Sequence, residues 1–242
     1  MEKFHLTNRF LMAGMAGTMV CLVAQACEAA QNDLPETSAV DSTDAVAIEH
    51  LPDPRRRDGM PLQQALAQRR SIRHLREETL TPEQISQLCW AGQGISSRRT
   101  GYRTAPSAGA LYPVVLFVVD ERGLFEYEPD QHRLLKLRTS DLRAELQQAA
   151  IGQEAVGDAP VCIVIAYDPA AVQRKYGKRA ERYCLLEVGH VAQNILLQAT
   201  ALGLGGVPVG AFDDVSIARV LNLPSRLRPV YVLPVGHPQA DR

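Results

Sequence analysis

The stretch covering residues 179–202 constrains the fold of this 242-residue chain more than any other feature. Apolar residues recur there at spacings of three and four, which is the period of an α-helix. They fill two adjacent stripes, so the predicted helix is apolar over most of its girth and must be buried on several sides. A central position in the domain or a subunit interface would bury it. The first stripe consists of Cys184, Val188, Val191, Ile195, Ala199 and Leu202, and the second of Leu185, Ala192 and Leu196.

Apolar, β-branched runs predict strands around this helix. Two runs that flank Asp130 predict a hairpin. Strands and helices mix without the strict alternation of a doubly wound sheet, so we expect an α+β fold with a central antiparallel or mixed sheet. The predicted strands cover residues 114–119, 124–129, 132–137, 160–168 and 230–235, and shorter helices are predicted at 62–69, 81–91 and 139–150.

Local residue choices predict where two of these helices begin and end. Thr81, Pro82 and Gln84 have the spacing of a capping box with proline at the first helical position. Gly203 directly follows the long helix and predicts its C-terminal cap.

The N-terminus resembles an export signal. Residues 1–26 combine a basic start, an uncharged apolar run and a small-x-small cleavage site, which is the pattern of a secretory signal peptide. Cys27 follows that site, so a lipid anchor is an alternative, and a retained anchor is another. Residues 27–58 contain many acids among Pro, Ser and Thr and predict a disordered acidic linker. The sequence thus predicts a folded domain at residues 59–242, carried by an exported chain.

Composition argues against several classes of partner. The net charge is −1, which favours neither nucleic acid nor an anionic membrane surface. Cys89, Cys162 and Cys184 form no C-x-x-C pair and lie in apolar segments, so we predict buried, inert thiols.

The segment "RTAPSAGALYPV", residues 103–114, admits three interpretations: a nucleophile turn, a backbone cradle for a phosphate or flat ring, and an ordinary turn before a strand. A nucleophile elbow requires G-x-S-x-G between a strand and a helix. Here Ala105 stands two residues before Ser107, and the turn leads into a strand, which argues against a serine hydrolase.

Two further segments could bind a ligand. Arg69, Ser71 and Arg73 would point the same way in an extended piece, and two guanidinium groups with a hydroxyl suit a phosphate. A solvated basic turn is the alternative. "ALGLGGVPVGAFDD", residues 201–214, holds four glycines in eight residues, more than one helix cap needs, and close approach of a flat ligand would explain the excess.

A metal site has weaker support. Glu187 and His190 stand three residues apart on the long helix, which is half of a di-iron carboxylate motif, but no second Glu-x-x-His occurs. A polar pair satisfied by hydrogen bonds is the alternative, and we predict no metal.

Taken in order, "RRSIR", "PSAGALYP", "KYGKRAERYCLLEVGHVAQNILLQATALGLGGVPVGAFDD" and "LPVGHP" resemble the nitroreductase superfamily. The order and spacing are most similar to its SagB-type branch, whose best-known members oxidise azolines to azoles in modified peptides. The resemblance spans residues 62–238. It implies a homodimeric α+β fold that holds FMN at the subunit interface.

The resemblance also implies roles for individual residues. Arg69, Arg70, Ser71 and Arg73 would hold the FMN phosphate and ribityl chain. Pro106, Ser107, Ala108 and Gly109 of the other subunit would line the ring, and Gly210 and Ala211 would cover it near its reactive nitrogen. Arg242 would join the phosphate site. Lys175 and Tyr176 resemble the catalytic Lys-Tyr pair of the azoline-oxidising members, with a surface turn as the alternative.

We therefore expect an exported, homodimeric FMN-dependent oxidoreductase that passes hydride to or from a small-molecule or peptide substrate, with NAD(P)H as a possible donor. Ala110 and Leu111 stand where many nitroreductases have Asn and then Gln-Pro-Trp, which favours the SagB-type branch. A flavin-free binding or scaffold protein and a metal-dependent enzyme using Glu187 and His190 are the alternatives.

Overall fold

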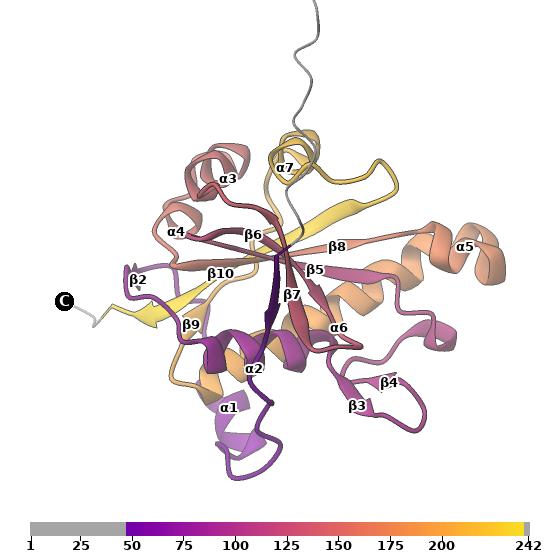
Figure 1. Cartoon of the computed structure of the whole chain (residues 1–242), viewed down its shortest axis with the longest axis horizontal. Coiled ribbons are helices and arrows are strands. Elements are labelled where there is room, and N and C mark those ends of the chain that lie inside the picture. Colours follow the sequence, from indigo (N-terminus) through magenta and orange to yellow (C-terminus); the bar gives the residue numbers. More distant parts are fainter. Residues whose placement is uncertain (1–46, 240–242) are drawn as a thin grey trace, which may run out of the picture. The chain divides into compact units, whose positions relative to one another are not determined.

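The computed structural model describes residues 47–239 (Figure 1). The predicted signal peptide (1–26), Cys27 and Arg242 lie outside these residues, as does the predicted linker up to residue 46. Among residues 47–239, no helix has both the length and the hydropathy needed to cross a membrane.

One antiparallel sheet forms the centre of the domain. Its strands follow the order β1-β7-β6-β5-β8-β10-β2, and β9 pairs with β10. Every ladder in it is antiparallel, so the predicted α+β class is confirmed. The strands are β1 (Ile48–His50), β2 (Leu75–Arg76), β5 (Val114–Asp120), β6 (Gly123–Glu128), β7 (Arg133–Arg138), β8 (Val161–Tyr167), β9 (Gly205–Gly206) and β10 (Arg228–Pro238), while β3 (Ile95–Ser97) and β4 (Tyr102–Arg103) pair separately.

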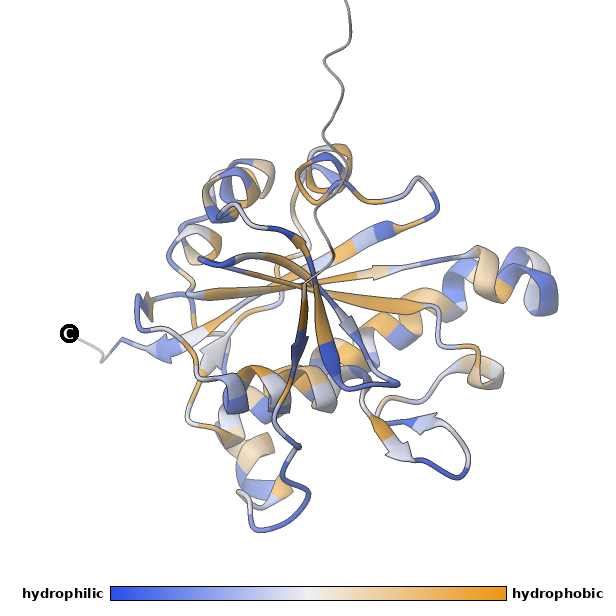
Figure 2. Ribbon diagram, in the orientation of Figure 1, coloured by the Kyte–Doolittle hydropathy of each residue, from blue (hydrophilic) through white to orange (hydrophobic). Residues whose placement is uncertain are grey.

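The central strands are apolar on both faces because each face carries a hydrophobic core. On β8, Ile163 and Ile165 belong to one core and Cys162 and Val164 to the other, as the alternation of a strand requires. All seven residues of β8 are buried. In Figure 2 the central strands are accordingly orange along their length.

Helices cover the two faces. One core includes residues of α2 (Pro82–Gln93) and α6 (Ala180–Ala201), and the other includes residues of α3 (Arg143–Ala149), α4 (Glu154–Gly157) and α7 (Asp214–Val220). Figure 1 shows α1 (Leu62–Gln68) on the α2 and α6 side. The short helix α5 (Ala170–Tyr176) leads from β8 towards α6.

The long helix is confirmed as α6, with 22 residues. Most of both predicted stripes is buried, whereas Leu185 remains 44% exposed. Gly203 adopts a φ of +73° beyond its end, and Leu204 N–H donates to the Ala199 carbonyl at 2.8 Å, as expected for a glycine cap. The capping box of α2 is also confirmed, with Thr81 and Gln84 bonded reciprocally.

Two predicted boundaries were wrong. The helix predicted at 139–150 begins only at Arg143, because the Asp141 carboxylate accepts the Arg143 backbone N–H at 3.1 Å and forms a local turn there. The predicted linker does not extend to residue 58, because Ile48–His50 form β1 against β7 and Leu51 is buried.

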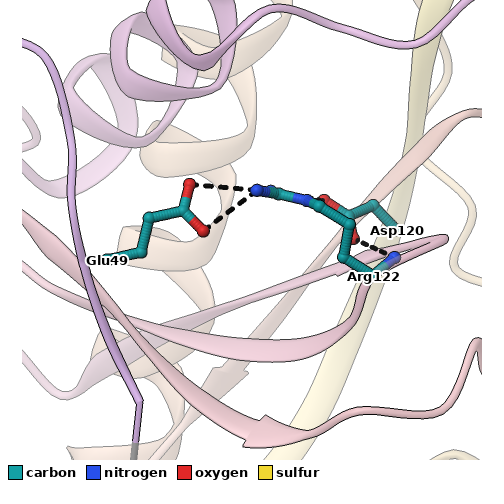
Figure 3. A network of polar contacts seen from close by, with 3 residues as sticks. All are labelled: Glu49, Asp120 and Arg122. Atoms are coloured by element: carbon teal, nitrogen blue, oxygen red, sulfur yellow. Dashed lines mark hydrogen bonds and ion pairs between the residues drawn. The ribbon is translucent and has the colours of Figure 1, made fainter.

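Polar contacts fasten this early segment to the domain. Glu49 on β1 accepts hydrogen bonds from the Arg122 guanidinium, which also binds Asp120 (Figure 3). Further along, the Gln87 amide bonds both the N–H and the carbonyl of Arg55, at 2.9 and 3.0 Å. Residues 47–58 therefore include an edge strand and its anchor, although their polar composition predicted a linker.

The three body cysteines are buried and unpaired, as predicted. Burial raises the pKa of the Cys89 and Cys162 thiols to about 12, so the reactive thiolate is suppressed.

Candidate active site at the serine turn

Residues 106–112, here called the serine turn, have an unusual backbone. Gly109, Ala110 and Tyr112 adopt φ values of +64°, +54° and +48°. Only the first is a glycine, so the other two store backbone strain that the surrounding structure must offset. Strain of this kind concentrates at functional sites, which makes the serine turn a candidate functional site.

The Ser107 hydroxyl holds the serine turn closed. Its Oγ accepts the Tyr112 backbone N–H at 2.9 Å, and the Ser107 carbonyl accepts Ala110 N–H at 3.1 Å. The turn then leads directly into β5 rather than into a helix. This geometry differs from a nucleophile elbow and agrees with the prediction that Ser107 is not a hydrolase nucleophile.

The Lys-Tyr pair lies against the serine turn. A Cβ placed on Gly109 would stand 2.6 Å from Lys175 Nζ and 3.0 Å from the Tyr176 hydroxyl. Because Gly109 has no side chain, the Lys175 amino group and the Tyr176 phenol can approach the turn. Lys175 is exposed and Tyr176 half-buried at the end of α5, where the Tyr176 ring packs on Tyr183 at 4.7 Å between centroids. The pair is therefore more than a surface turn before α6.

A polar network backs the serine turn on its buried side. Arg103 donates to Gln93 Oε1 at 2.8 Å, and Gln93 Nε2 donates to Glu187 Oε1 at 3.4 Å. The Arg103 guanidinium also stacks 4.7 Å above the Tyr112 ring, and Arg103 N–H donates to the Tyr112 hydroxyl at 3.2 Å. We call Gln93, Arg103, Ser107 and Glu187 the turn network.

Glu187 is the least satisfied member of the turn network. The residue is 2% exposed, and its Oε2 has no hydrogen-bond partner. Burial raises the pKa of this carboxyl, while Ser107, Gln93, Arg103 and His190 oppose the rise. Burial also lowers the pKa of Arg103, which Asp130 and Glu187 oppose.

The structure places Glu187 and His190 in different surroundings. Glu187 points into the domain, whereas His190 is exposed. Within residues 47–239, no group of three or more His, Cys, Asp or Glu side chains is arranged to hold a metal ion.

The predicted phosphate segment is extended, as the alternation required. Arg69 ends α1 with a ψ of 124°, and Ser71 forms a bridge to Gly206. Arg73 and Ser71 are exposed and Arg69 is half-buried. Arg70 differs, because its guanidinium donates to the carbonyls of Ala67 and Arg69 at 2.9 and 2.8 Å and so caps α1.

The glycine-rich segment serves two different purposes. A Cβ on Gly205 would stand 2.8 Å from Ile72, and one on Gly206 would stand 2.8 Å from the Pro234 carbonyl, so these two allow close packing of the chain itself. Gly210 is exposed, and a Cβ there would meet Tyr231 at 3.3 Å. Gly210 and the exposed Ala211 therefore present open backbone to a ligand.

The two halves of the predicted site lie at opposite ends of the central strands. The phosphate segment joins Gly206, whose partner Val235 pairs with Val161 at the start of β8. The serine turn precedes Val114, which pairs with Tyr167 at the end of β8. Six residue steps of a strand separate these ends by about 20 Å. The structure thus unites the serine turn with the Lys-Tyr pair but not with the phosphate segment of the same chain.

Gln93, Arg103 and Tyr112 were not predicted as site residues. Their side chains come from α2, β4 and the serine turn, and they meet through the contacts of Arg103 with Gln93 and with Tyr112. The sequence did not single them out, because the helix predicted at 81–91 ends before Gln93, and the burial of Gln93 (1% exposed) is known only from the structure.

Comparison with known proteins places the chain among relatives. The sequence profile of the nitroreductase family matches residues 66–237. A provisionally named nitroreductase of Methanocaldococcus jannaschii is 38% identical over 181 residues, covering 72% of this chain and 90% of the relative. The crystal structure of a provisionally named nitroreductase from Ralstonia eutropha JMP134 has a TM-score of 0.74 and 30% identity, over 80% of this chain and 90% of that one. The microcin B17-processing protein McbC of Escherichia coli is 26% identical over 152 residues, which is 58% of this chain and 56% of that protein.

Proposed function

The chain belongs to the nitroreductase family of oxidoreductases, and on that premise we propose that it is an FMN-dependent enzyme that works as a homodimer. FMN, when bound, supplies the hydride chemistry. The protein supplies binding, orientation and proton control. The serine turn is the observation that carries the proposal. Its backbone is strained, and because Gly109 has no side chain, Lys175 and Tyr176 lie close to it.

The available donors suit the cofactor. Arg69, Ser71 and Arg73 offer two guanidinium groups and a hydroxyl from one extended segment, which is the donor set that a phosphate prefers. Arg70 would contribute by closing α1 beside them. Pro106 to Gly109 would lie against the flat ring, and Gly210 and Ala211 would cover it with backbone. Arg242 is proposed as an additional phosphate contact.

The separation of the two half-sites supports the homodimer. About 20 Å of strand separates the phosphate segment from the serine turn of the same chain, which is a long span for one bound cofactor to bridge. A second copy can bring its own serine turn to the first copy's phosphate segment. Exposed apolar side chains on α1 and α6 supply a surface for that pairing, since Leu62, Leu66 and Leu186 are 60%, 53% and 50% exposed.

Within the family, we propose a SagB-type dehydrogenase role. The position of Lys175 Nζ and the Tyr176 hydroxyl at Gly109 supports it, since a Lys-Tyr pair beside the ring could hold or move a proton as the substrate is oxidised. The similarity to McbC, which is named as a microcin B17-processing protein, supports a role of this kind. A substrate screen separates this role from a general reductase: azoline peptides should turn over, whereas turnover of nitroaromatics and quinones alone would contradict it.

We also propose that the chain is exported, on the pattern of residues 1–26. Cell fractionation tests this directly. Recovery of the full-length, uncleaved chain in the cytosol would contradict export.

The FMN proposal is tested on the purified protein. The protein should be yellow, absorb at flavin wavelengths and release FMN on denaturation. The Arg69→Ala, Arg73→Ala double variant should bind FMN at least about 100-fold more weakly, because two charge-assisted contacts are lost. Arg76→Ala is the matched control, since its guanidinium pairs with Glu78 nearby. A colourless protein that also fails to bind added FMN would favour the flavin-free scaffold instead.

A further inference from the structure

Glu187 is a buried acid that the proposed reaction does not use, and it lies directly behind the serine turn. It is 2% exposed on the inward face of α6. Its Oε1 receives one long hydrogen bond from Gln93, at 3.4 Å, and its Oε2 receives none. An ionised carboxylate with an unmet oxygen in such a place is costly, because burial penalises charge that is not compensated.

The neighbouring cation does not compensate this acid directly. Arg103 directs its hydrogen bond to Gln93 Oε1, at 2.8 Å, and its face to the Tyr112 ring. Gln93 thus stands between the guanidinium and the carboxyl. The other titratable groups near Glu187 are His190 and Cys184 on α6 itself, and His190 is exposed to solvent.

The Ser107 hydroxyl can form further hydrogen bonds, and Glu187 lies near it. A serine hydroxyl has one proton to donate and two lone pairs that accept. The Tyr112 N–H occupies one lone pair, at 2.9 Å. The Ser107 hydroxyl also opposes the rise of the Glu187 pKa, although no hydrogen bond joins Ser107 to either Glu187 oxygen in this conformation.

These observations define two arrangements. If Glu187 is ionised, rotation of the Ser107 hydroxyl can direct its proton inward to the carboxylate. If Glu187 is protonated, the acid can donate to the second lone pair of Ser107, and the serine proton is free to point out of the turn. The protonation state of one buried acid therefore decides what the exposed side of the turn can offer a ligand.

We propose that Glu187 is a neutral carboxylic acid that acts as a positioning residue, fixing Ser107 as a hydrogen-bond donor towards the ligand of the serine turn. This inference rests on the proposed function, because the ligand is the FMN ring. Glu187 itself touches neither cofactor nor substrate.

Two readouts on the flavin-free protein test the protonation state. Infrared spectra at neutral pH should contain a protonated carboxyl band that disappears in Glu187→Gln. Thermal unfolding supplies the second. A raised pKa in the folded state means that stability is full below the ordinary value of 4.5 and is lost as pH rises through the folded value. Glu187→Gln should remove that loss. Absence of both the band and the slope would overturn the inference.

FMN titration tests the link to Ser107. Glu187→Gln keeps a neutral donor and should retain FMN affinity, whereas Glu187→Ala should weaken it by up to about tenfold, the effect of one hydrogen bond. In a Ser107→Ala background, Glu187→Ala should add nothing further. Full additivity of the two losses would contradict the coupling. Failure of every variant and of the wild type to bind FMN would instead refute the proposed function.

Discussion

Two polar networks in this domain differ in how completely their members are satisfied. At the sheet edge, Arg122 donates to both carboxylate oxygens of Glu49 and also to Asp120, at distances of 2.7 to 3.1 Å; we call these three residues the edge network (Figure 3). In the turn network, Glu187 keeps an oxygen without a partner, and strained backbone lies above it.

The difference separates a structural task from a functional one. A network that only fastens two segments is most stable when every donor and acceptor is paired. A buried acceptor that stays unmet lowers stability, and in a native protein it calls for an explanation such as a ligand or a proton. The edge network should therefore control stability without affecting FMN, whereas the turn network should control FMN affinity.

The largest effect is expected at Lys175. Lys175→Ala removes the ammonium that reaches Gly109, and loss of a positioned proton donor should lower the rate of substrate oxidation by about 100-fold. Stability should not change, because Lys175 is exposed. Single-turnover kinetics with bound FMN measure the rate. Lys178→Ala is the control, and equal rates for the two variants would show that Lys175 has no role in proton transfer.

Substitutions in the edge network should change the free energy of unfolding and leave FMN affinity unchanged. Arg122→Ala leaves Asp120, whose side chain is 5% exposed, without its ion pair. Because Arg122 itself is 37% exposed, solvent moderates the loss, and we expect about 1–2 kcal/mol in the free energy of unfolding. Chemical denaturation measures it, with Arg76→Ala as an exposed-pair control near zero. A change in FMN affinity would contradict the division of tasks.

The features that the sequence could predict are those that depend on neighbouring residues. The long helix, the capping box, the β6–β7 hairpin and the glycine cap depend on local periodicity or on residues within one turn, and all were found where expected. Similarly, the serine turn and the phosphate segment were recognisable because their residues are contiguous. The register that places these two at opposite ends of β8 depends on pairings between distant strands, so it needed the structure.

Both networks escaped prediction for the same reason. Glu49 lies in a stretch whose acids indicated a solvated linker, yet its partner Arg122 is 73 positions away. Gln93 and Glu187 are 94 positions apart. Side-chain hydrogen bonds over such separations leave no periodic trace, and only the burial of a polar residue reveals them.

Ser107→Ala tests the turn network and should have a smaller effect, on FMN affinity. The alanine cannot donate to the ligand and cannot accept the Tyr112 N–H, so FMN affinity should fall by up to about tenfold while turnover persists. Fluorescence titration of FMN measures the affinity. Ser96→Ala, which removes an exposed contact to the Tyr102 carbonyl, is the control. Complete loss of activity with FMN still bound would return Ser107 to the role of nucleophile.

The smallest effect concerns His132, which joins the segment after β1 to the domain. Its ring contacts Tyr127 and Ser86, each at 2.8 Å, and the Pro52 carbonyl at 3.0 Å. Burial lowers its pKa below 6.5, while the Pro52 carbonyl and Asp53 oppose this and Arg56 adds to it.

The sign of this shift is opposite to that of Glu187. The unfolded chain binds the His132 proton more readily, so stability is full above pH 6.5 and declines as pH falls through the folded value. His132→Gln should flatten this acid slope by less than about 1 kcal/mol, since the ring is only half-buried. Unfolding between pH 5 and 8 measures it, with the exposed His50→Gln as control. Falling pH would thus weaken the contacts of His132, whereas rising pH would weaken the turn network. Slopes of the same sign in the His132→Gln and Glu187→Gln comparisons would contradict this assignment.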